Sequence, residues 1–337
     1  MTGKERVLAM IGGKPVDHLP LMPITMMFAA DLSGVPYRDY AADHRVLADA
    51  QIRVAETFGF DYVSVISDPA REASDMGGAV EWFDNQPPAI VESKALLENK
   101  SRLRTLRLPD MSGPGRMRDR TLGVALLKEK AGESLIVEGW VEGPCALAAD
   151  FRGVNTLMLD FHDDPEYVND LFEFVVEMET AFARAQVDAG ADLIGIGDAA
   201  ASLIGPKLYD RFVLSFERKL VAAVQGTGAR VRLHICGNTR KILRGMGSLG
   251  CEIVDLDFLS PMAEGREAMG PDQVLLGNID PVRVLRDGTP ESITRALAEC
   301  HAAAGPRYIV GAGCEVPRGT PAENLMALFD YARSHQP

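Results

Sequence analysis

Short apolar runs alternate along the chain with longer segments in which apolar residues recur every three to four positions. The short runs lack strict apolar–polar alternation, which is typical of parallel strands buried on both faces. They predict eight strands, at residues 19–25, 62–66, 135–140, 192–196, 231–235, 252–256, 273–276 and 308–310. The helical period is clear at residues 165–188 and also predicts helices at 206–224, 290–304 and 321–334.

Eight strands that alternate with helices predict a (β/α)8 TIM barrel, because strand–helix–strand units build parallel sheets. The length of 337 residues suits a single barrel domain spanning residues 1–337. Residues 77–90 interrupt the alternation, and we expect them to form a hairpin inserted after the second strand. We expect residues 101–120 to form a long loop around a short helix, and the charged start of the chain to form an N-terminal helical extension.

Composition narrows the class of protein. The net charge of −13 argues against nucleic-acid binding, which needs a basic patch. No apolar run approaches the roughly 20 residues of a membrane span, and the N-terminus does not resemble a signal peptide, so we expect a cytoplasmic protein. The five scattered Cys favour free thiols or metal ligands over a disulfide framework.

Acidic residues follow several of the predicted strands. Barrel enzymes place their reactive residues at the carboxyl ends of the strands. Four acids in such positions are therefore our candidates for catalysis: Asp68, Glu142, Asp198 and Asp257. For the three Asp residues the alternative interpretation is an N-cap of the helix that follows each strand.

A His and two Cys could hold one zinc ion. His234 and Cys236 stand two positions apart at the end of a predicted strand, so they share one face. Cys314 follows the last predicted strand, and both strand ends open onto the same mouth of a barrel. Imidazole and thiolate are ligands that zinc prefers, and catalytic sites use three protein ligands with one position open. The alternative is that these are ordinary buried side chains.

The chain resembles the uroporphyrinogen decarboxylase superfamily over nearly its whole length. The motifs that carry the resemblance are KERVL at 4–8, ISD at 66–68, EGP at 142–144, GADL at 190–193, GPKLYDRF at 205–212, GNIDP at 277–281 and PRGTPAENL at 317–325. The resemblance implies a (β/α)8 barrel, in agreement with the strand count.

Two branches of this superfamily differ in chemistry. The decarboxylases use no metal and bind carboxylates through an Arg-rich N-terminal segment, whereas this chain reads LMPITMMF at 21–28 and has no Arg between Arg6 and Arg38. The corrinoid-linked methyltransferases, of the methylcobamide:coenzyme M and O-demethylase types, carry His-x-Cys and a distant Cys in GCEVP. This chain has HICGNT at 234–239 and GCEVP at 313–317, so it is more similar to the methyltransferases.

The resemblance implies a zinc-dependent methyltransferase with ligands His234, Cys236 and Cys314. A methyl group would pass between a small substrate and the cobalt of a corrinoid. Because the chain has no Asp-x-His-x-x-Gly segment of the kind that cobalamin-binding modules use, we expect the corrinoid on a partner protein. Glu142, Asp198 or Asp257 would supply a fourth zinc ligand or a proton, and Glu142 ranks first because it directly ends a strand.

The sequence does not identify the substrate or the oligomeric state. The motifs have no tight Arg or Lys cluster beside them, which favours a methyl ether such as a methoxy-aromatic compound over a sulfonated thiol. A homo-oligomer is compatible with the sequence. The first alternative is a metal-free decarboxylase centred on Asp68, and the second is a non-catalytic zinc-binding barrel that serves as a scaffold.

Overall fold

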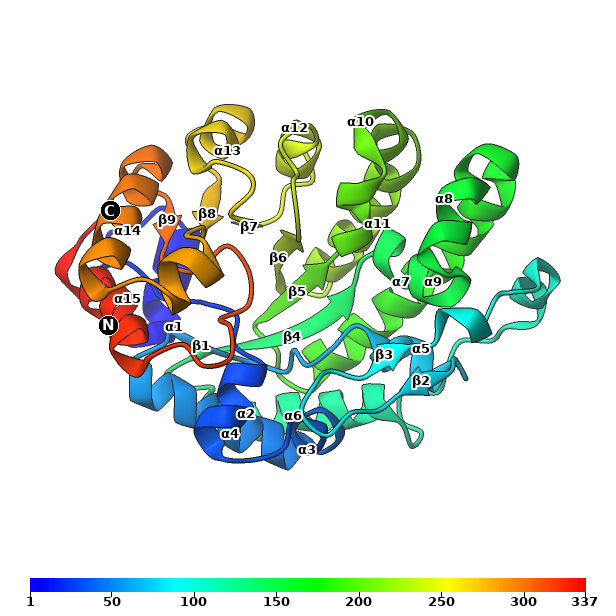
Figure 1. The fold of residues 1–337 in the computed structure, drawn as a ribbon, viewed down its shortest axis with the longest axis horizontal. Helices are drawn as coiled ribbons and strands as arrows, with labels where there is room; N and C mark the ends of the chain where they lie inside the picture. Colours follow the sequence, from blue (N-terminus) through cyan, green and yellow to red (C-terminus); the bar gives the residue numbers. More distant parts are fainter.

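A curled parallel sheet forms the centre of the computed structural model, which describes residues 1–337 (Figure 1). The strands follow one another around the sheet in chain order, and all pair in parallel, so their carboxyl ends meet at one edge. The seven strands are β1 (Tyr62–Ser64), β4 (Ile136–Glu142), β5 (Leu193–Gly197), β6 (Arg230–Ile235), β7 (Ile253–Leu256), β8 (Val274–Leu276) and β9 (Tyr308–Ile309).

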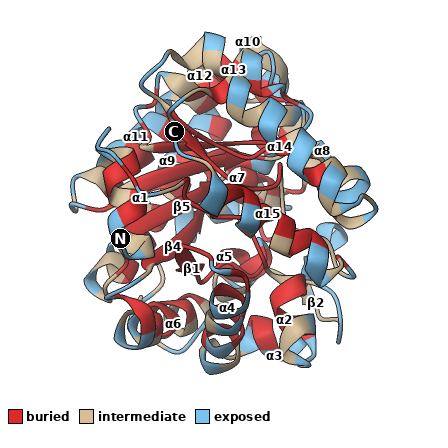
Figure 2. Cartoon of the chain, turned by 90° about the vertical axis from the view of Figure 1, so that its left-hand side faces the viewer, coloured by how far each residue is buried: buried red, intermediate tan, exposed pale blue.

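Helices surround the sheet and turn their buried faces towards it, while exposed residues lie on their outer faces (Figure 2). None of these helices combines the length and the apolar character needed to span a bilayer. The helices are α1 (Gly3–Ile11), α2 (Met27–Ser33), α3 (Tyr37–Ala42), α4 (His44–Phe58), α5 (Ala70–Asp75), α6 (Arg116–Ala131), α7 (Pro144–Arg152), α8 (Val154–Asp163), α9 (Pro165–Asp188), α10 (Gly205–Leu208), α11 (Leu214–Gln225), α12 (Leu243–Gly247), α13 (Met262–Met269), α14 (Pro290–Ala304) and α15 (Ala322–Ser334).

The (β/α)8-type fold is confirmed, but the first of the eight predicted strands is wrong. Residues 19–25 form only an isolated parallel bridge, between Leu21 and Val310. Pro20 and Pro23 have no N–H to donate, so this segment cannot build a regular ladder. It nevertheless takes the place of a strand. The Met22 N–H donates to the Val310 carbonyl at 2.9 Å on the β9 side, and the Leu21 carbonyl accepts from Asp61 at 3.0 Å on the β1 side.

The insertions agree in part with the sequence pattern. The hairpin is confirmed as the antiparallel pair β2 (Val80–Glu81) and β3 (Ala89–Ile90), and the N-terminal helix as α1. Within residues 101–120 the loop ends earlier than expected, because the 16-residue α6 begins at Arg116. The helix predicted at 206–224 is divided by the π-helical turn η4 (Tyr209–Val213). The remaining short turns are η1 (Glu92–Lys94), η2 (Lys100–Thr105), η3 (Ala199–Leu203) and η5 (Pro281–Arg286).

Asp61 joins the N-terminal helix to the closing segment. Its carboxylate accepts from the Leu21 N–H at 2.8 Å and pairs with the guanidinium of Arg6, and both acid and base are buried. Arg6 also pairs with Asp17, whose side chain is 37% exposed.

Replacing Asp61 by Ala should therefore lower the free energy of unfolding by about 3–5 kcal/mol, because Arg6 is left as a buried charge without its buried partner. Asp17→Ala is the control and should cost only about 0–1 kcal/mol, since Asp17 is partly solvated. Urea unfolding of both variants measures this, and equal losses would contradict it.

Candidate active site

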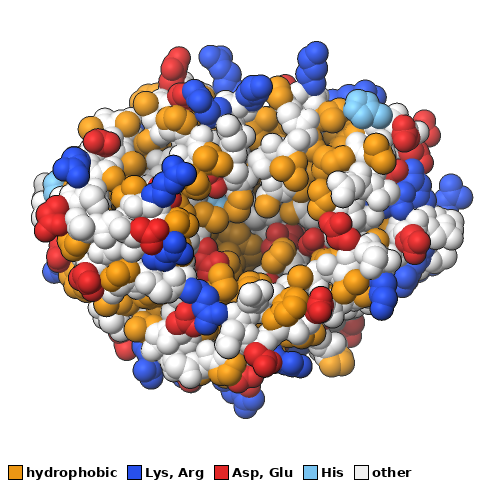
Figure 3. All heavy atoms as spheres, viewed as in Figure 1, with side chains coloured by type: hydrophobic (Ala, Val, Ile, Leu, Met, Phe, Trp, Pro, Cys, Tyr) orange, Lys and Arg blue, Asp and Glu red, His pale blue; other side chains and the backbone are white.

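A cavity of about 160 Å³ opens at the carboxyl ends of the strands, where Figure 3 shows a hollow with apolar and acidic side chains inside it. No Lys or Arg belongs to its lining. The wall consists of Ile24, Met26, Ile66, Pro69, Trp140, Gly197 and Ala199, with Asp68, Glu142, His234, Cys236, Cys314 and Glu315 as the polar and sulfur-bearing residues.

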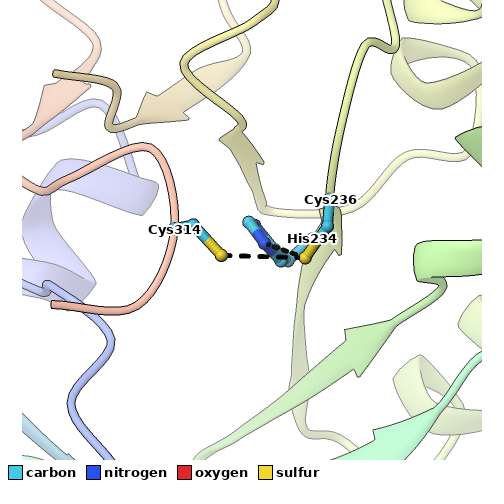
Figure 4. Close-up of side chains that lie close together, drawn as sticks. All are labelled: His234, Cys236 and Cys314. Carbon is cyan, nitrogen blue, oxygen red and sulfur yellow. Dashed lines mark hydrogen bonds between the residues drawn. The ribbon is translucent and has the colours of Figure 1, made fainter. Parts of the chain in front are cut away.

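His234, Cys236 and Cys314 converge in this cavity (Figure 4). Alternation along β6 turns His234 and Cys236 to the same side. The Nε2 atom of His234 lies 3.0 Å from Sγ of Cys236, and that Sγ lies 3.8 Å from Sγ of Cys314. One ligand atom from each residue lies within 4.8 Å of the other two. The strand positions therefore bring together three residues that the sequence separates by up to 80 positions (314 − 234).

The loop that carries Cys314 is fixed by an extension of the sheet. Beyond β8 and β9 a further parallel bridge joins Ile279 to Ala312, and the Gly313 N–H donates to the Ile279 carbonyl at 2.9 Å. A Cβ at Gly313 would stand 2.3 Å from the backbone N of Phe258. Only glycine allows the Cys314 loop to approach the loop after β7 this closely.

The three donors fit a zinc ion. Two sulfurs that each lie about 2.3 Å from one tetrahedral zinc are about 3.8 Å apart, and the Cys236–Cys314 distance is 3.8 Å. The hydrogen bond between the two thiols and the nearby imidazole lower the pKa of Cys314 to about 4, so a thiolate is available at neutral pH. The same hydrogen bond and burial raise the pKa of Cys236.

Asp255 lies beside His234 on the neighbouring strand, and Arg232 holds Asp255 in place. Asp255 is the residue that pairs with His234 in the β6–β7 register, and its Oδ2 lies 3.3 Å from His234 Nδ1 without good hydrogen-bond alignment. The same carboxylate oxygen accepts from Arg232 Nη2 at 2.6 Å. Carboxylates in this position fix the orientation of metal-binding imidazoles. The buried Asp255 is thus held as an anion by Arg232, and its pKa is lowered despite burial.

Asp257 holds the chain just beyond Cys236 instead of lining the cavity. Its carboxylate accepts from the N–H groups of Gly237 and Leu259, each at 2.8 Å. Burial raises its pKa, although these two amides oppose the shift. A role as proton donor or fourth ligand stays a prediction, and the hydrogen bonds give Asp257 a clear function in fixing the loop.

Asp68 lines the cavity as a paired anion. It forms a bidentate pair with Arg116, with one Nη1–Oδ1 distance of 2.8 Å, and also accepts from the Ser67 hydroxyl at 2.8 Å. These partners lower the pKa of Asp68 in spite of its burial. Asp68 is therefore poorly suited to donate a proton, and it does not cap the helix that follows it.

Glu142 and Glu315 are the cavity acids whose pKa values are raised. Burial raises the pKa of Glu142 well above its ordinary value, and the neighbouring Glu72 adds to the effect. Burial also raises the pKa of Glu315 to about 7, against the hydrogen bond that its Oε1 accepts from Met27 at 2.7 Å. The raised pKa of Glu142 favours its protonated form, which faces the cavity.

Asp198 is fully buried outside the cavity and caps a helix. It does not cap the helix after its own strand. Its carboxylate instead accepts from the Cys145 and Ala146 N–H groups, at 3.3 and 2.6 Å, which places it at the N-terminus of α7. A negative charge there is favourable, because the amides and the helix dipole point towards it. Its candidacy as a catalytic group stays a prediction without a contact to support it.

Several site residues were missed by the sequence argument. Arg116 gave no signal, because it lies in a segment expected to be a loop, 48 positions from its partner Asp68. Glu315 could have been noticed, because it directly follows Cys314, a predicted zinc ligand. Asp255 could have been found, because it precedes Asp257 by two positions on one strand and so shares its face. Trp140 lies on β4 against Gly195, where a Cβ would stand 2.2 Å from the indole ring.

The fold and the site are those of a known family. The uroporphyrinogen decarboxylase (URO-D) family matches residues 2–335, and the chain belongs to it. The resemblance drawn from the sequence motifs is thereby confirmed.

Among its relatives are methyltransferases of the kind that the sequence motifs resemble. The chain is 30% identical to the methylcobamide:CoM methyltransferase MtbA of Methanosarcina mazei, over 99% of this chain and 98% of the relative. It is 28% identical to the methylcobamide:CoM methyltransferase MtaA of Methanosarcina barkeri, over 97% and 96%. A solved methyltransferase from Methanosarcina mazei superposes with a TM-score of 0.90 over 99% of both chains, at 24% identity, and shows the same fold.

Because Asp198 is buried, we expect the free energy of unfolding to depend on pH. Burial raises its pKa from the ordinary 3.8 to about 6 in the folded protein. The folded chain then binds the proton more tightly than the unfolded chain, so stability falls as pH rises between about 4 and about 6. Over this range the parent should lose up to about 3 kcal/mol relative to Asp198→Asn, which does not titrate but keeps an oxygen acceptor. Denaturant unfolding at several pH values measures the difference, and parallel curves would refute it.

Proposed function

We propose that this protein is a zinc-dependent methyltransferase that moves a methyl group between a small substrate and the cobalt of a corrinoid on a partner protein. The observation that carries the proposal is the His234, Cys236 and Cys314 cluster in the cavity at the strand ends. The similarity to two methylcobamide:CoM methyltransferases supports methyl transfer. Residues 1–337 would act as one domain.

Different residues of the site would bind the metal, orient its ligands and exchange a proton. His234, Cys236 and Cys314 would hold zinc, which as a Lewis acid activates a thiol or polarises an ether oxygen. All three line the cavity, so a substrate atom can approach their open side. Asp255 would orient the imidazole, and Asp257 would hold the loop that follows Cys236. Glu142 would exchange a proton with the substrate.

The walls of the cavity favour an uncharged substrate. A sulfonate group needs a cation, and the lining contains none. The guanidinium groups beside two of the lining acids are occupied, since Arg116 is paired with Asp68 and Arg71 with Glu72. Apolar side chains and the indole of Trp140 form most of the remaining wall, which suits an aromatic ring. We therefore infer a methyl ether such as a methoxy-aromatic compound as the preferred donor.

The same features weigh against the two alternatives. A porphyrinogen decarboxylase must bind several carboxylates, and the cavity presents three acids and no Lys or Arg. Its essential Asp would be Asp68, which is bound by Arg116. A scaffold with a closed zinc site would need a fourth protein ligand beside the three, and no fourth donor belongs to their cluster.

Metal analysis tests the ligand set. The parent protein, purified without added metal, should contain near-stoichiometric zinc, and Cys314→Ala should lose most of it because one of three ligands is gone. Cys300→Ala, which removes a half-buried thiol elsewhere, is the matched control and should keep the zinc. Equal and negligible zinc in all three proteins would overturn the metal site.

A substrate panel tests the donor. With cob(I)alamin as acceptor, 2-methoxyphenol should be demethylated, whereas methylcobalamin should methylate 2-mercaptoethanol in preference to coenzyme M, since the cavity offers no cation for the sulfonate. The absorbance of the corrinoid reports both reactions. Transfer to coenzyme M alone, with no ether cleavage, would overturn the proposed substrate class and leave methyl transfer standing.

A further inference from the structure

A group of buried ionisable side chains adjoins Glu142 where helices α5, α7 and α9 pack near the end of β4. We call Glu72, Glu142, Asp150 and Glu179, with Arg71 among them, the acid cluster. Arg71 Nη2 lies 2.7 Å from Glu72 Oε1 and 3.4 Å from Glu142 Oε1. Arg71, Glu72 and Glu179 are fully buried.

The acid cluster holds four carboxyl groups and one cation. Several of its polar atoms are buried without a hydrogen-bond partner: Nε and Nη1 of Arg71, Oε2 of Glu72, Oδ2 of Asp150 and both oxygens of Glu179. Four ionised carboxylates beside one guanidinium would leave three uncompensated buried charges, which is prohibitively costly. Most of these carboxyl groups must therefore carry a proton.

The charges around the cluster do not change this conclusion. The main further charges acting on Glu142 and Asp150 from neighbouring elements are those of acids: Asp68, Glu92 and Asp198. Asp68 has its own partner in Arg116. Burial first, and then the neighbouring carboxylates, raise the pKa values of Glu142, Asp150 and Glu179 well above their ordinary range. The cluster also does not form a metal site, because none of its oxygens belongs to a group close enough to share an ion.

Glu142 is the one member of the cluster that lines the cavity. A substrate in the cavity can therefore exchange protons with the cluster only through Glu142. A structural ion pair for Arg71 would need Glu72 alone, so the additional buried acids call for another explanation.

Methyl transfer requires one proton per turnover. When cobalt(I) attacks a methyl ether, its electron pair forms the Co–C bond, and the electrons of the broken O–CH3 bond stay on oxygen as an alkoxide or phenolate. That oxygen must then take up a proton. In the opposite direction a thiol loses its proton before sulfur takes the methyl group from cobalt.

We propose that Glu142 exchanges this proton with the substrate oxygen or sulfur, and that Glu72, Asp150 and Glu179 are positioning residues that keep Glu142 protonated between turnovers. The inference rests on the proposed function. Glu72 matters most, because it occupies Arg71 and so prevents the guanidinium from pairing fully with Glu142.

Infrared spectroscopy of the zinc-loaded protein tests the protonation state without any turnover. At neutral pH the parent should show the C=O stretch of protonated carboxyl groups, and Glu142→Gln and Glu179→Gln should each weaken it. Asp160→Asn is the matched control, because Asp160 is a buried acid outside the cluster that is paired with Lys100 and Arg152. It should leave the band unchanged. A band unaffected by both Glu variants would overturn the proposal.

The pH dependence of demethylation tests the proton transfer, with 2-methoxyphenol as donor and cob(I)alamin as acceptor. Glu142→Gln should slow the reaction by roughly 10²–10⁴-fold. In Glu72→Gln the freed Arg71 should pair with Glu142, so the alkaline fall of the rate should move down by about 1 pH unit or more. Glu179→Gln should move it in the same direction, which covers the case that Glu72→Gln does not fold. Asp160→Asn should leave the profile in place.

The outcomes separate the two proposals. A full rate in Glu142→Gln, or profiles that coincide in the cluster variants, overturns the proton exchange and leaves the methyltransferase standing. A carboxyl band that responds as expected, in a protein that transfers no methyl group in either direction, overturns the proposed function and the proton exchange with it.

Discussion

The buried guanidinium of Arg232 is the interaction on which the rest of the site depends. From β6 it pairs with Asp255 on β7 at 2.6 Å and with Glu138 on β4 at 3.3 Å, and it lies over the ring of Tyr62 on β1. It also reaches the carbonyl of Met22 in the segment that closes the sheet, at 3.5 Å. One charge thus connects four strands and the closing segment, and a charge in this environment is stable only while its anions stay in place.

That constraint extends to the candidate metal ligands. Asp255 is bound by Arg232 on one side and faces His234 on the other, so the geometry of the ion network sets the orientation of the imidazole. Arg232 and His234 occupy alternate positions of the same strand, which aims both into the interior. The ion network between the strands and the orientation of the His234 imidazole therefore depend on the same carboxylate, that of Asp255.

The acids at the mouth fall into two electrostatic groups. Asp68 and Asp255 have guanidinium partners that lower their pKa values, whereas the pKa values of Glu142 and Glu315 are raised by burial, and the one guanidinium near Glu142, that of Arg71, lies closer to Glu72. The same carboxyl group is thus stabilised as an anion where an arginine is paired with it closely, and favours the protonated form where burial outweighs such pairing.

The sequence by itself determined seven of the eight predicted strand positions, the hairpin and the convergence of His234, Cys236 and Cys314. These follow from periodicity and from the rule that parallel strands end at one edge, both of which are local or topological. Only the tertiary structure decided that residues 19–25 close the sheet without forming a strand, that Arg116 binds Asp68 and that Asp198 caps α7. Those outcomes depend on which side chains meet across tens of residues, and packing in three dimensions alone selects such partners.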